Sequence, residues 1–254
     1  MPTTLIVLAH PERRSFTGAW ADASAAAARA LGHDVEWSDL YGMNFGAAEG
    51  PNYYSPDLAR SPFDPLKVQE TAAAGNRLPV EVAAEIDKIR RADLVVFHFP
   101  IWWFAPPAIL KGWCDRALVH GALHNVDTRF DLGLCQGKKA LFCVSTGATE
   151  AESGYSGKEG DTRLLLWPLA YTLRYLGFAV LDPMTVHGVH GYFEGDEETA
   201  LRARLSGVLQ RQTQALAALD AAPIWPFNSD TDFDGAGRLR PDSPQFSPFI
   251  RHRP

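Results

Sequence analysis

Five short apolar runs, separated by longer mixed segments, recur along the first 190 residues of the chain. The first, at 4–9, reads TLIVLA and contains no polar residue after Thr4. A continuous apolar run is typical of a strand buried on both faces, as in a parallel sheet. We therefore predict strands at 4–9, 34–40, 93–99 and 138–145, with a weaker one at 178–186.

Helical patterns fill the spaces between these runs. The stretch 20–31 is rich in alanine and ends at Gly32, and a second helix opens at Pro79, a residue favoured in a first helical turn. Further helices are expected at 107–118, at 162–176 and, as one long amphipathic helix, at 194–219. Strands that alternate with helices predict an α/β fold with a doubly wound parallel sheet, for which the five-stranded order 2-1-3-4-5 is the natural arrangement.

Two segments depart from this rhythm. Residues 41–78 are rich in Gly, Pro, Asn and Asp, and a long insert of this kind inside a domain is usually functional or disordered. Residues 222–254 are rich in proline and carry five aromatic residues, so we expect an extended C-terminal arm that packs on another surface, such as a partner subunit. The predicted organisation is one main domain at 1–221, with its insert at 41–78, followed by the arm at 222–254.

Composition narrows the class of protein. The chain is 46% hydrophobic, which is enough for a substantial core, and its net charge is 24 − 30 = −6, without a basic stripe. Nucleic-acid binding is therefore not expected. Three cysteines cannot form a framework of disulfides and indicate reduced thiols. Because no signal peptide and no apolar run of membrane-spanning length is visible, we expect a cytoplasmic protein without an integral membrane segment.

Ligands of open α/β sheets bind beyond the carboxyl ends of the strands, which here are followed by loops at 10–19, 100–107 and 145–161. The first loop has neither GxGxxG nor GxxxxGK[ST]. It does place His10, Arg14, Ser15 and Thr17 just before a helix, where backbone N–H groups and hydroxyls can bind phosphate. An ordinary N-cap beside a surface histidine is the alternative interpretation.

The second loop, PIWWFAPP, puts three aromatic residues directly after a buried strand. Stacking on a planar ligand would account for them, and packing of Trp102 or Trp103 beneath the next helix is the alternative. The third loop is rich in Ser, Thr and Gly, so its backbone can approach the edge of a ring closely, although turn formation alone also explains this composition. His187 and His190 (HGVHG) have a spacing that suits metal ligands, but no cysteine or carboxylate completes a set, and no metal site is predicted.

Taken together, these residues resemble the NAD(P)H:quinone oxidoreductase family, the DT-diaphorase type of flavodoxin-like flavoproteins. The similarity extends over about residues 4–190. It is carried by VLAHPERRSF, SDLYGMNF, VAAEIDKIRRADLVVFHFP, WFAPPAILKGW and LLLWP. The resemblance implies a flavodoxin-like fold, a homodimer with the active site at its interface, and FAD as cofactor, since the length fits the FAD-binding branch better than the shorter FMN-binding relatives.

The resemblance also implies roles for single residues. The phosphate and ribityl parts of the flavin would be held by His10, Phe16 and Thr17, with Ser15 in the same loop. The isoalloxazine would be lined by Ile101, Trp102, Trp103 and Phe104, and its edge would be contacted by Ser145, Thr146, Gly147 and Ala148. Asp64 and Arg202 fall where the family holds the adenine end. The substrate-facing residues, reaching in from the other subunit, would be His124, Asn125, Val126 and Tyr175.

Some of these positions depart from the family's pattern. The tyrosine and histidine that assist charge movement in the family correspond to Ser153 and Glu159 here, and Tyr155 lies two residues from the first. These three residues are the candidate catalytic groups. His124 and Val126 replace two tyrosines, so the shape of the quinone pocket is expected to differ.

The implied activity is a ping-pong, two-electron transfer of hydride from NADPH or NADH through the flavin to a quinone. Backbone N–H groups of 146–148 would stabilise the anionic reduced flavin. Three alternatives stay open: an ancillary regulatory subunit of an ion-efflux transporter, a one-electron carrier of the flavodoxin kind, and reduction of azo or nitroaromatic compounds.

Overall fold

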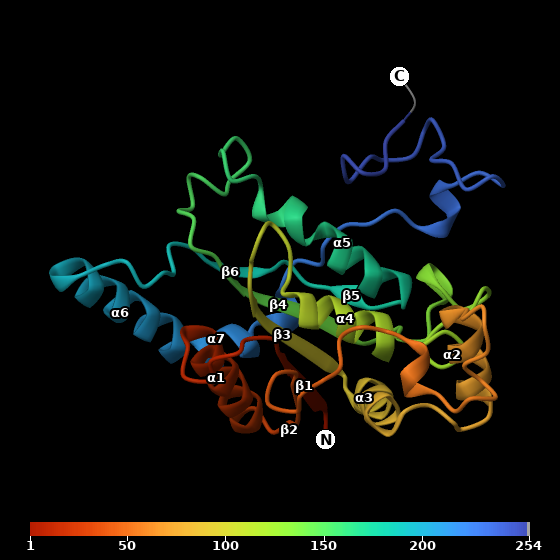
Figure 1. The fold of residues 1–254 in the computed structure, drawn as a ribbon. Helices are drawn as coiled ribbons and strands as arrows, with labels where there is room; N and C mark the ends of the chain where they lie inside the picture. The colour runs from red at the N-terminus through yellow and green to blue at the C-terminus, as the bar shows by residue number, and fades with distance from the viewer. Residues whose placement is uncertain (253–254) are drawn as a thin grey trace.

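Every strand pairing in the central sheet is parallel, and the sheet has the order β2-β1-β3-β4-β5 in the computed structural model, which describes residues 1–252 (Figure 1). The predicted doubly wound α/β fold and its strand order are thus confirmed. The strands are β1 (Thr3–Leu8), β2 (Asp34–Asp39), β3 (Leu94–Pro100), β4 (Lys139–Ser145), β5 (Ala179–Val180) and β6 (Met184–Val186). The helices are α1 (Phe16–Ala30), α2 (Pro65–Ala74), α3 (Val80–Arg91), α4 (Ala108–Ala117), α5 (Thr162–Tyr175), α6 (Gly195–Gln210) and α7 (Gln212–Ala217).

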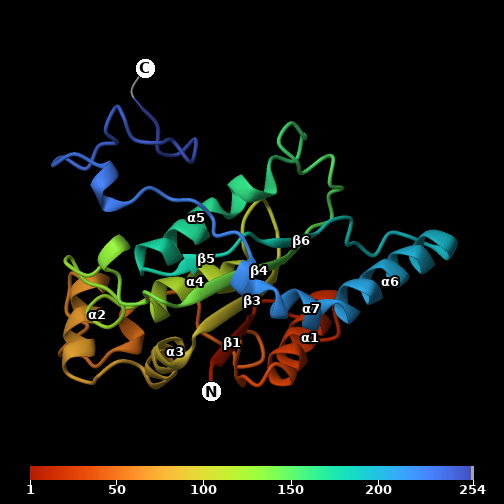
Figure 2. The same cartoon turned by 180° about the vertical axis from the view of Figure 1, so that it is seen from behind.

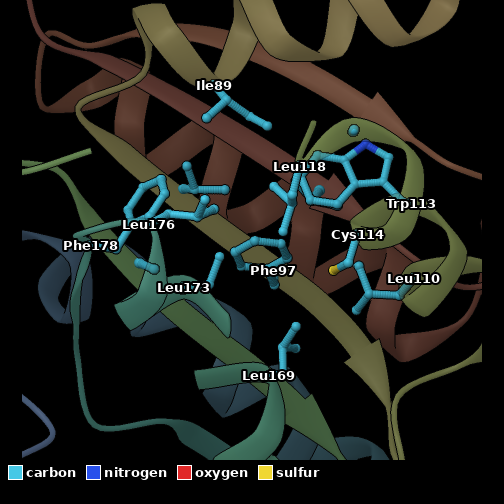
Figure 3. Packing of buried hydrophobic residues seen from close by; sticks show 14 of the residues in the cluster. Ile89, Phe97, Leu110, Trp113, Cys114, Leu118, Leu169, Leu173, Leu176 and Phe178 are labelled. Atoms are coloured by element: carbon cyan, nitrogen blue, oxygen red, sulfur yellow. The ribbon is translucent and has the colours of Figure 1, made fainter. Parts of the chain in front are cut away.

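The sheet separates two hydrophobic cores. Side chains that alternate along β1, β3 and β4 pack on one side against α3, α4 and α5, and on the other side against α1 and α7 (Figures 1 and 2). Figure 3 shows the first core, where Phe97 of β3 lies between α4 residues and the leucines of α5. Burial on both faces explains why the central strands are continuously apolar in sequence.

The predicted fifth strand is interrupted. β5 and β6 both pair with β4, but Leu181–Pro183 separates them, because Pro183 has no N–H to give to the sheet. The N–H of Asp182 instead donates to the carbonyl of Pro223 at 3.0 Å. The expected single strand at 178–186 is therefore wrong as one element, although its place at the end of the sheet order is right.

Three helix predictions also need correction. The first helix begins one turn earlier than predicted, at Phe16, because Ser15 caps it. The insert contains an unpredicted helix, α2, which Asp64 caps and Pro65 opens. The long helix expected at 194–219 breaks at Arg211 into α6 and α7. None of the residues of α6 is buried, although Leu205, Val208 and Leu209 are partly buried against the second core, and α7 packs on α1.

The C-terminal arm packs on its own chain. Ile224 forms an antiparallel bridge with Leu181, and the N–H of Trp225 donates to the carbonyl of Val180 at 2.8 Å. Farther along, Phe249 stacks on Trp167 of α5 with ring centroids 4.7 Å apart. The described part of the arm therefore finds its apolar partners along β5 and α5. The division of the chain at residue 221 stays a prediction.

The three cysteines are buried free thiols. Within residues 1–252, no helix has the length and apolar character needed to cross a membrane. The same residues contain no cluster of histidine, cysteine and carboxylate side chains suited to a metal ion.

Candidate functional site

The loops that follow β1, β3 and β4 meet at the carboxyl edge of the sheet. The Thr17 hydroxyl lies 3.2 Å from the Ser145 hydroxyl, which joins the start of α1 to the end of β4. The His10 ring lies 5.8 Å from the ring of Trp102, which joins the first loop to the second. Parallel strands therefore bring together three segments that are up to 135 residues apart in sequence.

The first loop is folded tightly onto the N-terminus of α1. The Ser15 hydroxyl accepts a hydrogen bond from the N–H of Gly18 at 3.1 Å, and a Cβ at Gly18 would lie 2.1 Å from the carbonyl oxygen of Arg13. Only glycine permits this approach. The first turn of α1 has no acidic residue, so its free N–H groups form a site suited to an anion. His10 Nδ1 lies within hydrogen-bond distance of the backbone of Glu12, and partial burial lowers the pKa of His10.

The second loop is a strained aromatic turn. Trp102 and Ala105 exchange two backbone hydrogen bonds of 2.9 and 3.1 Å, so Trp103 and Phe104 occupy the turn with φ of 49° and 62°. Positive φ is costly for bulky residues, and strained positions of this kind cluster at functional sites. Burial of the two side chains does not offset this strain, since Trp103 is 94% exposed and Phe104 is 53% exposed. This turn presents its rings to solvent, and the alternative in which Trp103 packs beneath the next helix is wrong.

The aromatic turn and the loop after β4 enclose a cavity of about 280 Å³. Its lining joins the aromatic turn to the third loop and to the start of α5: Ile101, Trp103, Phe104, Thr146, Ala148, Ser153, Glu159, Thr162 and Leu165. The third loop is held by the end of β6 and the residues after it, because the backbone of Thr146 donates to Val186 and accepts from Val189. Gly147 is exposed between the two lining residues Thr146 and Ala148. One wall is thus aromatic, and the opposite wall offers hydroxyl and backbone polar groups.

The structure brings two of the three candidate catalytic residues to this cavity. Ser153 is buried, and its hydroxyl donates to the carbonyl of Thr149 at 2.6 Å. Glu159 also lines the cavity, whereas Tyr155 is 94% exposed and is not part of the lining. Its catalytic role stays a prediction.

The candidate substrate residues lie elsewhere in the same chain. A groove of about 780 Å³ runs between α4 and α5 and shares Phe104 and Leu165 with the smaller cavity. His124 and Tyr175 line this groove with ring centroids 5.2 Å apart, and burial lowers the pKa of His124. The Asn125 side chain accepts backbone N–H groups within its own turn, and Val126 is exposed.

The two residues expected at the adenine end are not brought together within one chain. Asp64 caps α2 by accepting from the N–H of Lys67, and Arg202 lies on α6, paired with Glu198 at 2.6 Å. Figures 1 and 2 show α2 and α6 at opposite ends of the molecule. A single chain therefore cannot place both residues on one ligand.

Sequence reasoning missed two kinds of site residue. Thr162 and Leu165 line the cavity from the first turn of α5, and although Leu165 lies in the LLLWP stretch, neither residue was expected at the site. His187 lies behind the cavity wall, with Nδ1 2.9 Å from the Ser153 hydroxyl. Its position directly after the last strand was a usable signal, since ligands collect at that edge of the sheet.

The strand order, the anion-suited helix terminus and the aromatic cavity define a doubly wound protein of the flavodoxin type. A family model for the flavodoxin-like fold matches residues 2–211, and the chain belongs to this family.

The chain is 40% identical over 191 residues to NAD(P)H dehydrogenase [quinone] 1 of Rattus norvegicus, covering 73% of this chain and 68% of the relative. It is 40% identical over 181 residues to human ribosyldihydronicotinamide dehydrogenase [quinone], covering 70% and 78%. A crystal structure of a candidate quinone reductase from Klebsiella pneumoniae superposes with a TM-score of 0.81 at 27% identity, over 95% of each chain.

Proposed function

We propose that this protein is a flavin-dependent NAD(P)H:quinone oxidoreductase. The names of its relatives support the activity. Within the chain itself, the main observation that supports it is the aromatic turn at 102–105. Two exposed rings held at positive φ opposite a polar loop form a slot for a planar, polar-edged ring. A flavin bound there supplies hydride acceptance and donation, while the protein positions it.

The described residues fit such a cofactor. Trp103 and Phe104 offer ring faces for stacking, and the loop at 146–148 offers polar groups to the edge of the ring. The first turn of α1, with Ser15, Phe16 and Thr17, lies beside this slot through the contact between Thr17 and Ser145 and is suited to phosphate. We assign FAD rather than FMN, on the length of the chain and its resemblance to the FAD-binding branch.

The active form is proposed to be a homodimer. The groove between α4 and α5 is a large, mostly apolar opening continuous with the cavity, and water-exposed apolar grooves of this size mark binding surfaces. A partner at this groove would bring His124, Val126 and Tyr175 of one subunit toward the cavity of the other. It would also explain how Asp64 and Arg202 can serve one adenine, although they lie far apart in one chain. The buried free cysteines suit a reducing, cytoplasmic setting.

The first experiment is an absorbance spectrum of the purified protein before and after anaerobic addition of NADPH or NADH, with the released cofactor identified by mass. We expect a yellow protein that releases FAD, bleaches without a semiquinone band, and regains its colour with menadione. A protein that takes up neither FAD nor FMN on reconstitution would refute the proposal. A stable semiquinone would indicate a one-electron carrier, and bound flavin that neither nucleotide reduces would favour a regulatory role.

A further inference from the structure

Quinone reduction by NAD(P)H takes up one proton from solution for each hydride that moves, because the hydroquinone carries two hydrogens and the nicotinamide supplies only one. The cavity therefore needs a path for a proton. Neither carbonyl oxygens nor aromatic rings can relay one, so the proton-carrying side chains on the polar wall are the groups to consider. Four such side chains line the cavity: Thr146, Ser153, Glu159 and Thr162. Among these lining residues, Ser153 is the one with a hydrogen bond to a further ionisable side chain, His187.

Hydrogen-bond counting fixes the protonation of His187. A serine hydroxyl has one hydrogen, and Ser153 donates it to the carbonyl of Thr149, which can only accept. The 2.9 Å contact between the Ser153 hydroxyl and His187 Nδ1 is then a hydrogen bond only if Nδ1 carries the proton. The other ring nitrogen, Nε2, has no hydrogen-bond partner within residues 1–252 and is not among their buried, unpartnered atoms, so it faces solvent.

We propose that His187 is a proton-positioning residue, which passes a solvent proton through the Ser153 hydroxyl into the cavity. Nε2 takes up a proton from water while Nδ1 gives its proton to the Ser153 oxygen. The Ser153 hydrogen turns from the Thr149 carbonyl toward the cavity and is transferred to the reduced quinone, which is anionic until it gains this proton. One proton enters at Nε2 and one leaves to the cavity, so charge balances, and the neutral ring is left protonated at Nε2. It resets when the ring turns away from Ser153, Nδ1 takes a proton from water and Nε2 releases one to water. The inference rests on the proposed quinone reduction.

The surroundings of His187 suit this role. The Arg204 guanidinium donates to the backbone carbonyl of His187 at 2.8 Å, which fixes the segment without occupying the ring. Burial and Arg204 lower the pKa of His187, and Glu150 acts in the opposite direction. The ring is therefore neutral at pH 7 and free to take up a proton at Nε2. Glu159 is the remaining ionisable group on the cavity wall.

The structural part of the proposal is tested without turnover, by long-range ¹H–¹⁵N NMR of the histidine rings in the full-length protein. We expect His187 to be the Nδ1-protonated tautomer and its signals to shift in Ser153→Ala. A His187 ring in the Nε2-protonated form that does not respond to Ser153→Ala overturns the proposal.

The functional part compares His187→Ala, His187→Asn and, as a matched control in the same segment, His190→Asn. The Asn side chain can keep a donor near the place of Nδ1 but cannot relay a proton. We expect kcat for quinone reduction at pH 7 to fall by roughly 10²-fold in both His187 variants, the lower end for a positioned proton donor. Free imidazole should partly restore His187→Ala only, and His190→Asn should match the unmodified protein.

A His187→Asn variant with unchanged kcat and pH profile would show that the contact with Ser153 is only structural, and the inference would be wrong. Failure of the unmodified protein to reduce any quinone would instead refute the proposed function. In that case the NMR measurement still decides whether His187 donates to Ser153.

Discussion

The strained turn at Trp103 makes a quantitative prediction for the variant Trp103→Gly. A left-handed backbone costs a non-glycine residue about 1–2 kcal/mol, and glycine removes this cost. Glycine also loses more freedom on folding, which costs about 0.5–1 kcal/mol. Because the Trp103 side chain is 94% exposed, its removal from the apoprotein loses almost no burial. The expected net effect is a stabilisation of about 0–1.5 kcal/mol.

Binding of the flavin should change in the opposite direction. Trp103 forms part of the aromatic wall of the cavity, and an aromatic stacking contact contributes about 0.5–1.5 kcal/mol beyond burial. Loss of that contact corresponds to a dissociation constant raised by about 2- to 12-fold. We therefore expect the Trp103→Gly apoprotein to be more stable than the unmodified apoprotein and to bind flavin more weakly.

Urea unfolding of the apoprotein and titration of flavin fluorescence measure the two effects separately. Asn44→Gly is the matched control, because Asn44 also has positive φ, at 50°, but lies outside the cavity lining. It should leave the flavin affinity unchanged. Destabilisation of the apoprotein by Trp103→Gly by more than about 1 kcal/mol would show that positive φ at Trp103 does not strain the turn.

Three further predictions concern buried groups. Arg116 is fully buried, donates to Glu81 at 2.8 Å and lies over the Tyr53 ring, so Arg116→Met should lower the unfolding free energy by about 3 kcal/mol in urea titrations. The exposed pair Arg91–Glu36 serves as control, and Arg91→Met should cost no more than about 1 kcal/mol. Burial raises the pKa of Cys135 to about 11 and that of Cys114 to about 12, so a thiol reagent at pH 8 should modify all three cysteines only after unfolding. Burial lowers the pKa of His98 to about 3. Below about pH 6 the unfolded chain therefore binds a proton at this residue that the folded chain does not. As pH falls from about 6 to about 4, His98 should lower the unfolding free energy by about 1.4 kcal/mol per pH unit, and the unfolding free energy of His98→Gln should lack this contribution to its dependence on pH.

Much of the site was visible in the sequence because it lies on short loops directly after buried strands. The apolar runs fixed where the central strands begin and end within a few residues, and the rule that ligands bind at their carboxyl ends selected the loops at 10–19, 100–107 and 145–161. The phosphate-suited start of α1 and the aromatic turn follow from those positions. Residues that reach the cavity from α5, such as Leu165, were missed because helix packing decides which face of a helix meets the cavity.

The sequence by itself determined the parallel sheet, its order and the aromatic loop, because these depend on local apolar runs and on the alternation of strands and helices. Only the tertiary structure decided that Trp103 and Phe104 stand in a left-handed turn and that Tyr155 is exposed and outside the cavity lining. The contact between Ser153 and His187 joins residues 34 positions apart through the pairing of β6 with β4. Contacts over such a separation depend on the register between strands and on the place where a strand is interrupted. The presence of Pro183 in the sequence does not by itself reveal the register or the place of the interruption.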